Sequence, residues 1–275
     1  MDENPEPRDR RVTESAEAFR RDGWLLLEDV VETGLIEQLH ASYTDRHCSS
    51  TRLRESLRVG HQRYMITVRL KPPFTDSRLY ANPVLLGVLT DLLGAERVLS
   101  SFSAVVSYPG AEDQHVHQDG GGLFGDPARE GSLPPYAVTA IVPLVEMNSE
   151  TGTTRVWPGS QRPTDDEPGS IEPVDPLVRK GSVLLMDYRL QHGGLANRSA
   201  GLRPILSLVF TRPWFRDAVN FGEQPPLLYG PLERRRMPPE LGRLLPADAD
   251  AGFERRALAR GRRMVAMARK RLVRS

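Results

Sequence analysis

The stretch Val98–Gly110, VLSSFSAVVSYPG, marks the point at which the chain changes from helical to β character. It has no helical period, and Pro109-Gly110 is a turn signal, so we expect a strand over Val98–Tyr108. Four later stretches also lack a helical period and are bounded by Gly and Pro residues. They are Ala137–Val145, Thr153–Trp157, Ser182–Asp187 and Pro204–Thr211. Short strands at this spacing after a helical beginning predict a sandwich or jelly roll.

The residues before Val98 predict three helices and one short strand. The expected elements are a helix capped at Thr13 or Ser15 and ending near Gly23, a strand over Trp24–Leu27, a helix capped at Thr33, and a helix from Asn82-Pro83 to Gly94. The second helix has one apolar stripe, made of Leu35, Ile36, Leu39 and Tyr43. Residues 46–63 are polar and rich in arginine, without a clear period, which indicates a loop or a short helix.

The segment Gln114–Asp119, QHVHQD, carries a possible metal site together with the distant His192. In an extended strand, residues i and i+2 share a face, so His117 and Asp119 can aim at one point that His192 completes. Two His and one carboxylate, with other coordination positions open, suit non-haem Fe(II) that activates oxygen. By parity His115 lies on the same face and competes with His117. It has no carboxylate two residues on, so we favour His117.

An iron site of this kind needs a partner that supplies electrons. If that partner is 2-oxoglutarate, its distal carboxylate needs a fixed cation, and the planar fork of an arginine suits it best. Arg203 lies eleven residues after His192 at the start of the last predicted strand. The alternative is that Arg203 is a surface arginine beside Pro204.

Composition excludes several other classes of function. The chain has 275 residues, 39% of them hydrophobic and 27% charged, as in a soluble globular protein. A net charge of +1 gives no overall attraction to nucleic acid or to an anionic membrane. Cys48 is the single cysteine, so no internal disulfide can form, and no apolar run approaches the length of a membrane span. The charged residues 1–11 are not a secretory signal, so we expect a cytoplasmic protein.

The two ends of the chain differ from the rest. Residues 1–12 predict a loosely attached arm, and residues 249–275 predict a basic helix with nine Arg or Lys between Arg255 and Arg274. A nucleic-acid or membrane patch is one interpretation of this tail. We favour an amphipathic helix that packs on the domain, because Phe253 is its only aromatic residue. We therefore expect no nucleic-acid and no membrane partner, and the oligomeric state stays open.

Six segments occur in a particular order along roughly residues 16–215. They are Phe19–Trp24, Asn82–Leu86 with Leu93-Gly94, His117–Asp119, Thr151–Ser160, Lys180–Asp187, and His192–Ser199 running on to Arg203. Together they resemble the phytanoyl-CoA dioxygenase family of Fe(II)/2-oxoglutarate oxygenases. The resemblance implies a mainly β fold with flanking helices, namely a double-stranded β-helix (a cupin-like jelly roll) with the N-terminal helices packed on one sheet. We expect one such domain over residues 1–275.

The resemblance also implies roles for individual residues. Position by position, the iron ligands match His117, Asp119 and His192, and the residues that bind 2-oxoglutarate match Arg203 and Thr154. His115 stands where several relatives have a glutamine that contacts the cosubstrate, and an imidazole can donate one hydrogen bond there. The usual Pro-Gly-Ser-His of the family ends here in Gln161. That departure leaves loop packing and substrate contacts near Gln161 undecided.

We predict a 2-oxoglutarate-dependent non-haem iron dioxygenase that uses Fe(II), 2-oxoglutarate and O2, with ascorbate as an optional reductant. Succinate and carbon dioxide would form while an unactivated carbon of a small metabolite is hydroxylated, desaturated, epoxidised or cyclised, as in natural-product biosynthesis. A related halogenase is disfavoured, because Asp119 occupies the coordination place that halide needs. A cupin-like metal- or ligand-binding protein without turnover is the main alternative, and Arg203 argues against it. A nucleic-acid-binding protein acting through the basic tail is the third.

The sequence does not fix the substrate contacts. Candidates near the mouth of the site are Tyr64, Met65, Arg69, Lys71, Phe74, Phe124, Trp157 and Trp214. Residues 47–63 and 124–133 have few periodic apolar residues, so we expect them to be mobile covers that become ordered when substrate binds.

Overall fold

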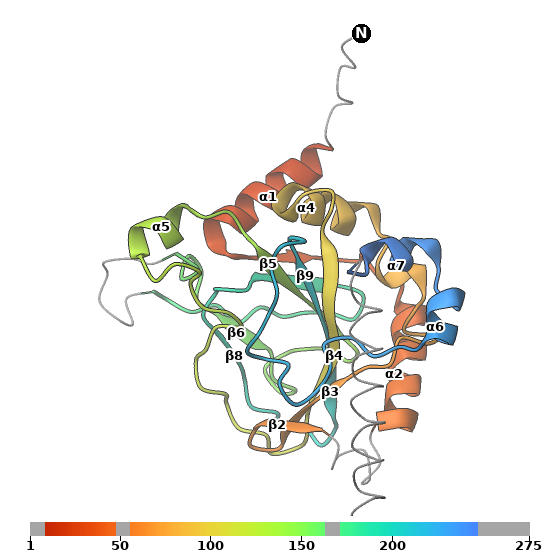
Figure 1. Ribbon diagram of the computed structural model, residues 1–275. Helices are drawn as coiled ribbons and strands as arrows, with labels where there is room; N and C mark the ends of the chain where they lie inside the picture. The colour runs from red at the N-terminus through yellow and green to blue at the C-terminus, as the bar shows by residue number, and fades with distance from the viewer. Residues whose placement is uncertain (1–8, 48–55, 163–170, 247–275) are drawn as a thin grey trace, which may run out of the picture.

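Figure 1 presents a computed structural model of the protein, which describes residues 9–47, 56–162 and 171–246. Its centre is a seven-stranded antiparallel sheet with the strand order β1-β7-β5-β9-β4-β3-β2, and β6 and β8 form a second, two-stranded sheet. The strands are β1 Trp24–Leu27, β2 Leu57–Gly60, β3 Arg63–Thr67, β4 Val98–Ser107, β5 Ala137–Pro143, β6 Thr154–Val156, β7 Val183–Asp187, β8 His192–Gly194 and β9 Arg203–Thr211. Neighbours in the large sheet that are distant in sequence, such as β5 and β9, are typical of a jelly roll.

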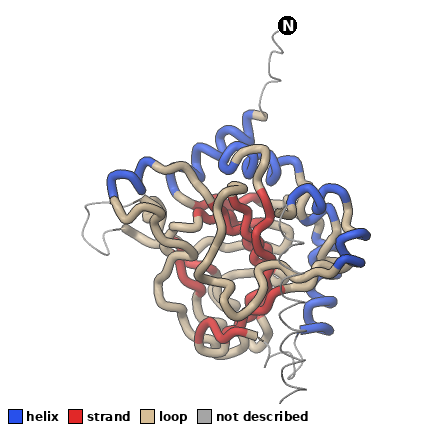
Figure 2. Tube along the Cα trace, in the orientation of Figure 1, coloured by secondary structure: helices blue, strands red, loops and turns tan. Residues whose placement is uncertain are grey.

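Most helices gather along one side of the large sheet (Figure 2). They are α1 Arg10–Asp22, α2 Thr33–His47, the 3₁₀ helix η1 Ser77–Leu79, α4 Pro83–Leu93, α6 Pro231–Arg236 and α7 Pro239–Leu244. The short helix α5 Pro127–Ser132 lies apart from them. The helices α1 and α4 approach closely at Gly87, where an added Cβ would lie 2.7 Å from a methyl group of Val12. An ion pair between Arg20 and Asp91 also joins them.

The period of two along each strand divides the large sheet into two buried faces. Leu206 of β9 belongs to the same apolar cluster as Phe19 of α1 and Leu89 of α4, so its face is covered by helices. Ile205 belongs to a second cluster that includes Val156 of β6. We call the face that carries Ile205, turned toward β6, the inner face. The fold is therefore mainly β with helices packed on one sheet, as expected.

The inner face is not uniformly apolar. On β9 and β4, Arg203 lies opposite Ser107, and on β5 Thr139 lies two residues before Ile141. Arg203, Ser107 and Thr139 are all buried. Buried polar groups must find partners, so this polar group of residues marks the inner face as the place where a polar ligand fits.

The predicted helices are largely confirmed. The helix α2 buries Leu35, Ile36, Leu39 and Tyr43, which is the stripe expected from sequence. The side chain of Asn82 accepts hydrogen bonds from the first N–H groups of α4, and Gly94 ends that helix. The strands β4, β5, β6, β7 and β9 lie within one or two residues of their predicted limits.

The expected start of α1 is wrong. The helix begins at Arg10 and its cap is Asp9, whose carboxylate accepts from the N–H of Arg11 at 2.9 Å, so neither Thr13 nor Ser15 caps it. Residues 10–12 are thus helical and not part of an arm, because Val12 packs against Gly87. Residues 1–8 lie outside the described residues.

The loop or short helix expected over residues 46–63 is also wrong where the structure describes it. Leu57–Gly60 forms β2, and β3 begins at Arg63 and pairs with β4. β2 is an edge strand of the sheet, where short strands with charged residues are common, so the apolar alternation is weak there. The expected cover over residues 124–133 contains the short helix α5. Residues 48–55 and the predicted basic helix at 249–275 fall outside the described residues.

Candidate metal centre

The candidate centre is built on one backbone pairing. His117 and His192 form an antiparallel bridge in which each N–H donates to the carbonyl of the other at 2.9 Å. The segment around His117 thereby extends the sheet of β6 and β8. Residues paired in this way direct their side chains to the same face, and the two imidazole centroids are 4.4 Å apart.

Both imidazoles are oriented by the main chain. The Nδ1 of His117 is 2.9 Å from the carbonyl oxygen of His115, and the Nδ1 of His192 is 3.0 Å from that of Leu190. A carbonyl can only accept, so Nδ1 carries the proton in each ring and Nε2 keeps its lone pair for a ligand. Burial, followed by the neighbouring His192, lowers the pKa of His117, which favours the neutral imidazole that a metal requires.

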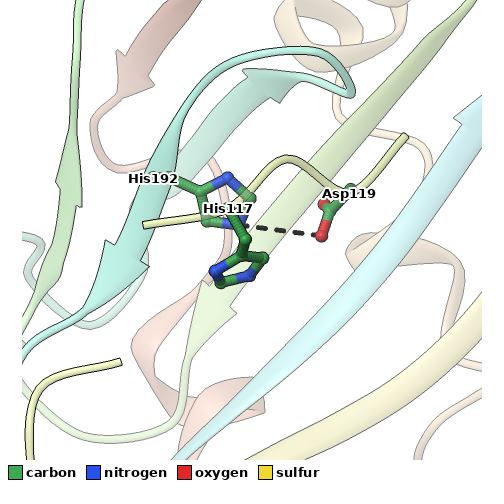
Figure 3. A group of neighbouring side chains, drawn as sticks. All are labelled: His117, Asp119 and His192. Carbon is green, nitrogen blue, oxygen red and sulfur yellow. Dashed lines mark ion pairs between the residues drawn. The ribbon is translucent and has the colours of Figure 1, made fainter. Parts of the chain in front are cut away.

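Asp119 completes the group (Figure 3). Its Oδ1 is 3.6 Å from the Nε2 of His192, and its Oδ2 accepts from the hydroxyl of Thr139 at 2.6 Å. One ligand atom from each of His117, Asp119 and His192 lies within 4.8 Å of the other two. Two imidazole nitrogens and one carboxylate oxygen on one side of a point are a donor set that suits Fe(II) with open positions. Sequence reasoning missed Thr139, since a threonine in a buried strand has no distinguishing pattern.

Arg203 is a buried cation without a carboxylate partner in the described parts of the chain. Only 2% of it is exposed; its Nη2 donates to Ser107 Oγ at 2.9 Å, and its Nε has no partner. Burial, and then the charge of Arg63, lower the pKa of Arg203 to about 9. A group in this environment needs an anion, and the distal carboxylate of 2-oxoglutarate would supply one. The residues present therefore fit this cosubstrate.

Arg63 is a second buried arginine that the sequence did not reveal. Its Nε shares Ser107 Oγ with Arg203, at 2.8 Å, and its Nη1 and Nη2 donate to the carbonyls of Gly194 and Leu195 at 2.9 Å. These bonds fix the chain just after His192. Each of the three guanidinium nitrogens of Arg63 has a partner, whereas the buried Nε of Arg203 has none.

The remaining predicted residues, Thr154, His115 and Gln161, have different environments. Thr154 is buried on β6 opposite Gly194, on the face that carries His192 by the period of two. The His115 ring is exposed, with its centroid 5.3 Å from that of His117. Gln161 is buried at the end of α1, where its Nε2 donates to the carbonyls of Arg20 and Arg21. Its role there is loop packing.

Among the proposed substrate contacts, Phe74 is wrong, because it is buried in the helix-side cluster against Phe102. Arg69 forms an ion pair with Glu233. Phe124 and Trp214, by contrast, are 60% and 61% exposed.

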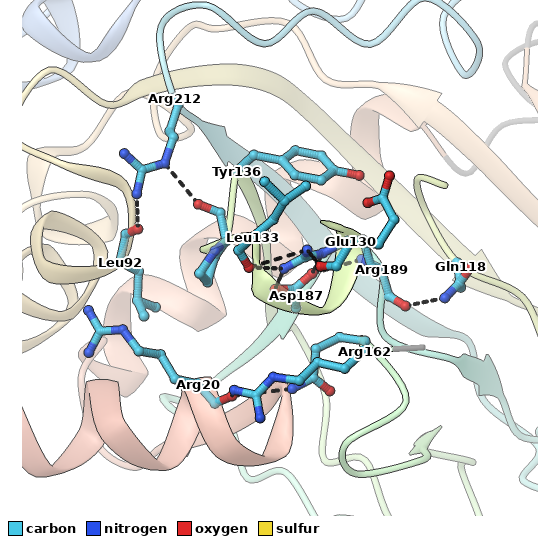
Figure 4. Close-up of polar contacts among 12 residues, drawn as sticks. Arg20, Leu92, Gln118, Glu130, Leu133, Tyr136, Arg162, Asp187, Arg189 and Arg212 are labelled. Carbon is cyan, nitrogen blue, oxygen red and sulfur yellow. Dashed lines mark hydrogen bonds and ion pairs between the residues drawn. The ribbon is translucent and has the colours of Figure 1, made fainter. Parts of the chain in front are cut away.

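A buried ion pair supports the turn that precedes His192 (Figure 4). Arg189 and Asp187 are 2.9 Å apart, and the guanidinium carbon of Arg189 is 5.3 Å from the centroid of the Tyr136 ring. The carbonyl of Arg189 accepts from the side chain of Gln118, which lies between His117 and Asp119. The loop with the two upstream candidate ligands is thus tied to the turn that leads to the third.

None of the helices within the described ranges is both long and apolar enough to cross a membrane.

Residues 19–205 match the phytanoyl-CoA dioxygenase (PhyH) family. "Dioxygenase af480" of Aspergillus fumigatus is 30% identical over 155 residues, which cover 54% of this chain and 48% of that protein, about half of its length.

Two solved structures share the fold. SnoN, a "non-heme alpha ketoglutarate dependent epimerase" from nogalamycin biosynthesis, has a TM-score of 0.57 and 21% identity over 74% of this chain and 83% of its own. HygX from Streptomyces hygroscopicus, solved with nickel, 2-oxoglutarate and hygromycin B, has a TM-score of 0.57 and 18% identity over 74% of this chain and 88% of its own. The match over residues 19–205 shows more than a shared fold. The chain belongs to the phytanoyl-CoA dioxygenase family.

Proposed function

We propose that His117, Asp119 and His192 hold one Fe(II), and that the enzyme oxidises an unactivated carbon of a small metabolite. The observation that carries this proposal is the convergence of one nitrogen from each imidazole and one carboxylate oxygen. Because each Nδ1 is already bonded to a carbonyl, Nε2 is the nitrogen left for the metal. A purely structural histidine pair has no need for two unprotonated nitrogens directed at the same carboxylate. When bound, the iron supplies oxidation of a C–H bond by O2, coupled to conversion of 2-oxoglutarate into succinate and carbon dioxide.

Arg203 binds the distal carboxylate of 2-oxoglutarate in this proposal, and Thr154 and His115 donate further hydrogen bonds to it. Support comes from the unpartnered Nε of Arg203 and from the position of its Nη2, 3.5 Å from the carbonyl of Leu195, three residues after His192. Thr139 holds one oxygen of Asp119, so that the other oxygen faces His192. The apolar side chains of Ile141, Met186 and Ile205 on the inner face keep bulk water from this side.

The substrate class rests on analogy. SnoN was solved with nogalamycin RO and HygX with hygromycin B, so natural-product intermediates are the substrates to test first. We propose a single oxygenase domain in the cytoplasm, without nucleic-acid or membrane partners. The alternative is a cupin-like protein that binds a metal and a ligand without turnover.

The test is to incubate the purified chain with Fe(II), 2-oxoglutarate and O2 and a panel of polycyclic and glycosidic natural products. Mass spectrometry then detects succinate and a product that has gained one oxygen atom or lost two hydrogen atoms. Tight binding of Fe(II) and 2-oxoglutarate with no succinate, for any compound or in the absence of one, would favour the binding protein. His192→Ala is the control that must lose both metal and turnover.

A further inference from the structure

Asn220 lies beyond residues 19–205, yet its side chain contacts the main chain of Asp119. The Asn220 Nδ2 donates to the carbonyl of Asp119 at 2.8 Å and to Asp217 Oδ2 at 2.8 Å, and Tyr188 Oη is 3.2 Å away. Tyr188 in turn donates its hydroxyl to the same Asp217 oxygen. We propose that Asn220, supported by Tyr188 and Asp217, is a positioning residue for the metal ligand Asp119. This inference rests on the proposed role of Asp119 in the metal site.

Asp119 needs support on its main chain because three glycines follow it. Glycine leaves the backbone many conformations, so a ligand placed before such a run is poorly fixed by local structure alone. Thr139 restrains only the carboxylate of Asp119. The peptide group between Asp119 and Gly120 is held by residues distant in sequence. Its carbonyl, from Asp119, accepts from Asn220, and its N–H, from Gly120, donates to the carbonyl of Tyr188 at 2.8 Å.

The glycine at position 120 itself makes this arrangement possible. An added Cβ there would lie 2.4 Å from Cδ1 and 2.8 Å from Cε1 of Tyr188. Those ring atoms are too close for any side chain to be accommodated without moving Tyr188. The ring of Tyr188 therefore lies directly against the main chain that carries Asp119.

The protonation states of the supporting pair are fixed by their surroundings. Burial, with the charge of Asp119 and the bond to Asp217, raises the pKa of Tyr188, so its hydroxyl keeps the proton that it donates. Burial opposes ionisation of Asp217, but the hydrogen bonds from Tyr188 and from the main chain and side chain of Asn220 lower its pKa. Asp217 is thus a carboxylate that accepts from all three sources.

The segment that carries Asn220 is itself held in place. Asp217 Oδ1 accepts from the N–H groups of Val219 and Asn220 at 2.9 and 3.0 Å, which closes a turn. Phe215 packs on Tyr136 and Tyr188, with ring centroids 4.6 and 6.0 Å apart. Asn220 therefore presents its amide from a braced turn, which is what a positioning group requires.

The experiment measures Mn(II) binding to the metal-free protein by electron paramagnetic resonance, in the wild type and in Asn220→Ala. Removing an outer partner of a ligand typically weakens metal binding about 10-fold or more, and we expect the dissociation constant to rise about tenfold. Tyr188→Phe keeps the ring against Gly120 but loses the bond to Asp217, and we expect a smaller rise, of severalfold. Asn220→Gln, with a longer arm, should restore little of the loss.

Asn82→Ala is the matched control. Asn82 also makes three hydrogen bonds, to the N–H groups of Val84 and Leu85 and to the carbonyl of Val30, but it caps α4 on the helix side of the sheet. The Asn82→Ala variant should have a lower melting temperature than the wild type and an unchanged Mn(II) dissociation constant. A dissociation constant within twofold of the wild type in both Asn220→Ala and Tyr188→Phe overturns the inference. If Asp119→Ala also binds Mn(II) as tightly as the wild type, the proposed metal site itself is wrong. If Asp119→Ala is the only variant that binds Mn(II) more weakly, the metal site stands and only the role of Asn220 fails.

Discussion

Replacing Arg203 with methionine should make the protein without cosubstrate more stable while destroying its affinity for 2-oxoglutarate. Arg203 is a buried cation, and its Nε has no partner. Chiefly through burial, its pKa is lowered from the usual arginine value to about 9. At 1.36 kcal/mol per pKa unit, keeping this charge buried costs up to about 5 kcal/mol. Loss of the bond to Ser107 offsets part of the gain, since a neutral replacement forfeits about 1 kcal/mol for each such bond.

The net stabilisation expected in Arg203→Met is therefore about 1–3 kcal/mol. Urea unfolding of the two proteins without metal or cosubstrate measures it. The difference should also depend on pH in one direction. Below pH 9 the arginine is charged in both the folded and the unfolded chain, so the folded state bears the full free-energy cost of the buried charge. Above about pH 9 the folded state releases the proton before the unfolded state does, so wild-type stability rises relative to the variant.

Binding of 2-oxoglutarate should change in the opposite sense. Loss of a charged, two-pronged contact costs on the order of 2–5 kcal/mol, which weakens binding by more than tenfold. Calorimetric titration under anaerobic conditions with Fe(II) present measures this affinity. If Arg203→Met is less stable than the wild type at neutral pH and still binds 2-oxoglutarate normally, then Arg203 is a structural residue with an adequate partner and not the cosubstrate anchor.

Three further changes test other parts of the account. Thr139→Val removes the hydroxyl that holds Asp119 and should weaken Mn(II) binding about tenfold, with little effect on folding; an unchanged affinity would contradict a supporting role. Gly194→Ala would place a Cβ 2.6 Å from Arg63 Nη1 and 2.7 Å from Gln114 Oε1, so unfolding by urea should show a loss of about 1–3 kcal/mol. A variant as stable as the wild type would show that Arg63 moves freely. Removing metal with a chelator should lower the melting temperature of the wild type, but not of Asp119→Ala; equal shifts would mean that the metal binds elsewhere.

The sequence was sufficient for the parts of the fold that depend on local signals. The cap at Asn82, the stop at Gly94 and the stripe of α2 are determined by neighbouring residues, and the structure confirms all three. The start of α1 was missed because Asp9, Thr13 and Ser15 are all good caps, and the choice depends on the packing of Val12 against a distant helix. No local rule contains that contact.

The same division holds for the candidate site. The spacing of His117 and Asp119 could be interpreted because residues i and i+2 in an extended chain share a face. His192 was the candidate third ligand, and the family resemblance supported that choice. The supporting groups could not be found in this way. Thr139, Arg63 and Asn220 reach the site through pairings across 20 residues or more, and each is an ordinary residue in its own segment. Only the folded chain brings their polar atoms to the same place.

The most direct test of the central claim is the amount of succinate formed from 2-oxoglutarate in air, measured with and without added Fe(II) for the wild type and for His117→Ala, Asp119→Ala and His192→Ala. We predict iron-dependent succinate in the wild type and none above background in the three variants, all of which should keep the wild-type circular dichroism spectrum. Succinate formation at the wild-type rate in any folded variant, or without iron, would contradict the assignment of these three residues as the metal centre.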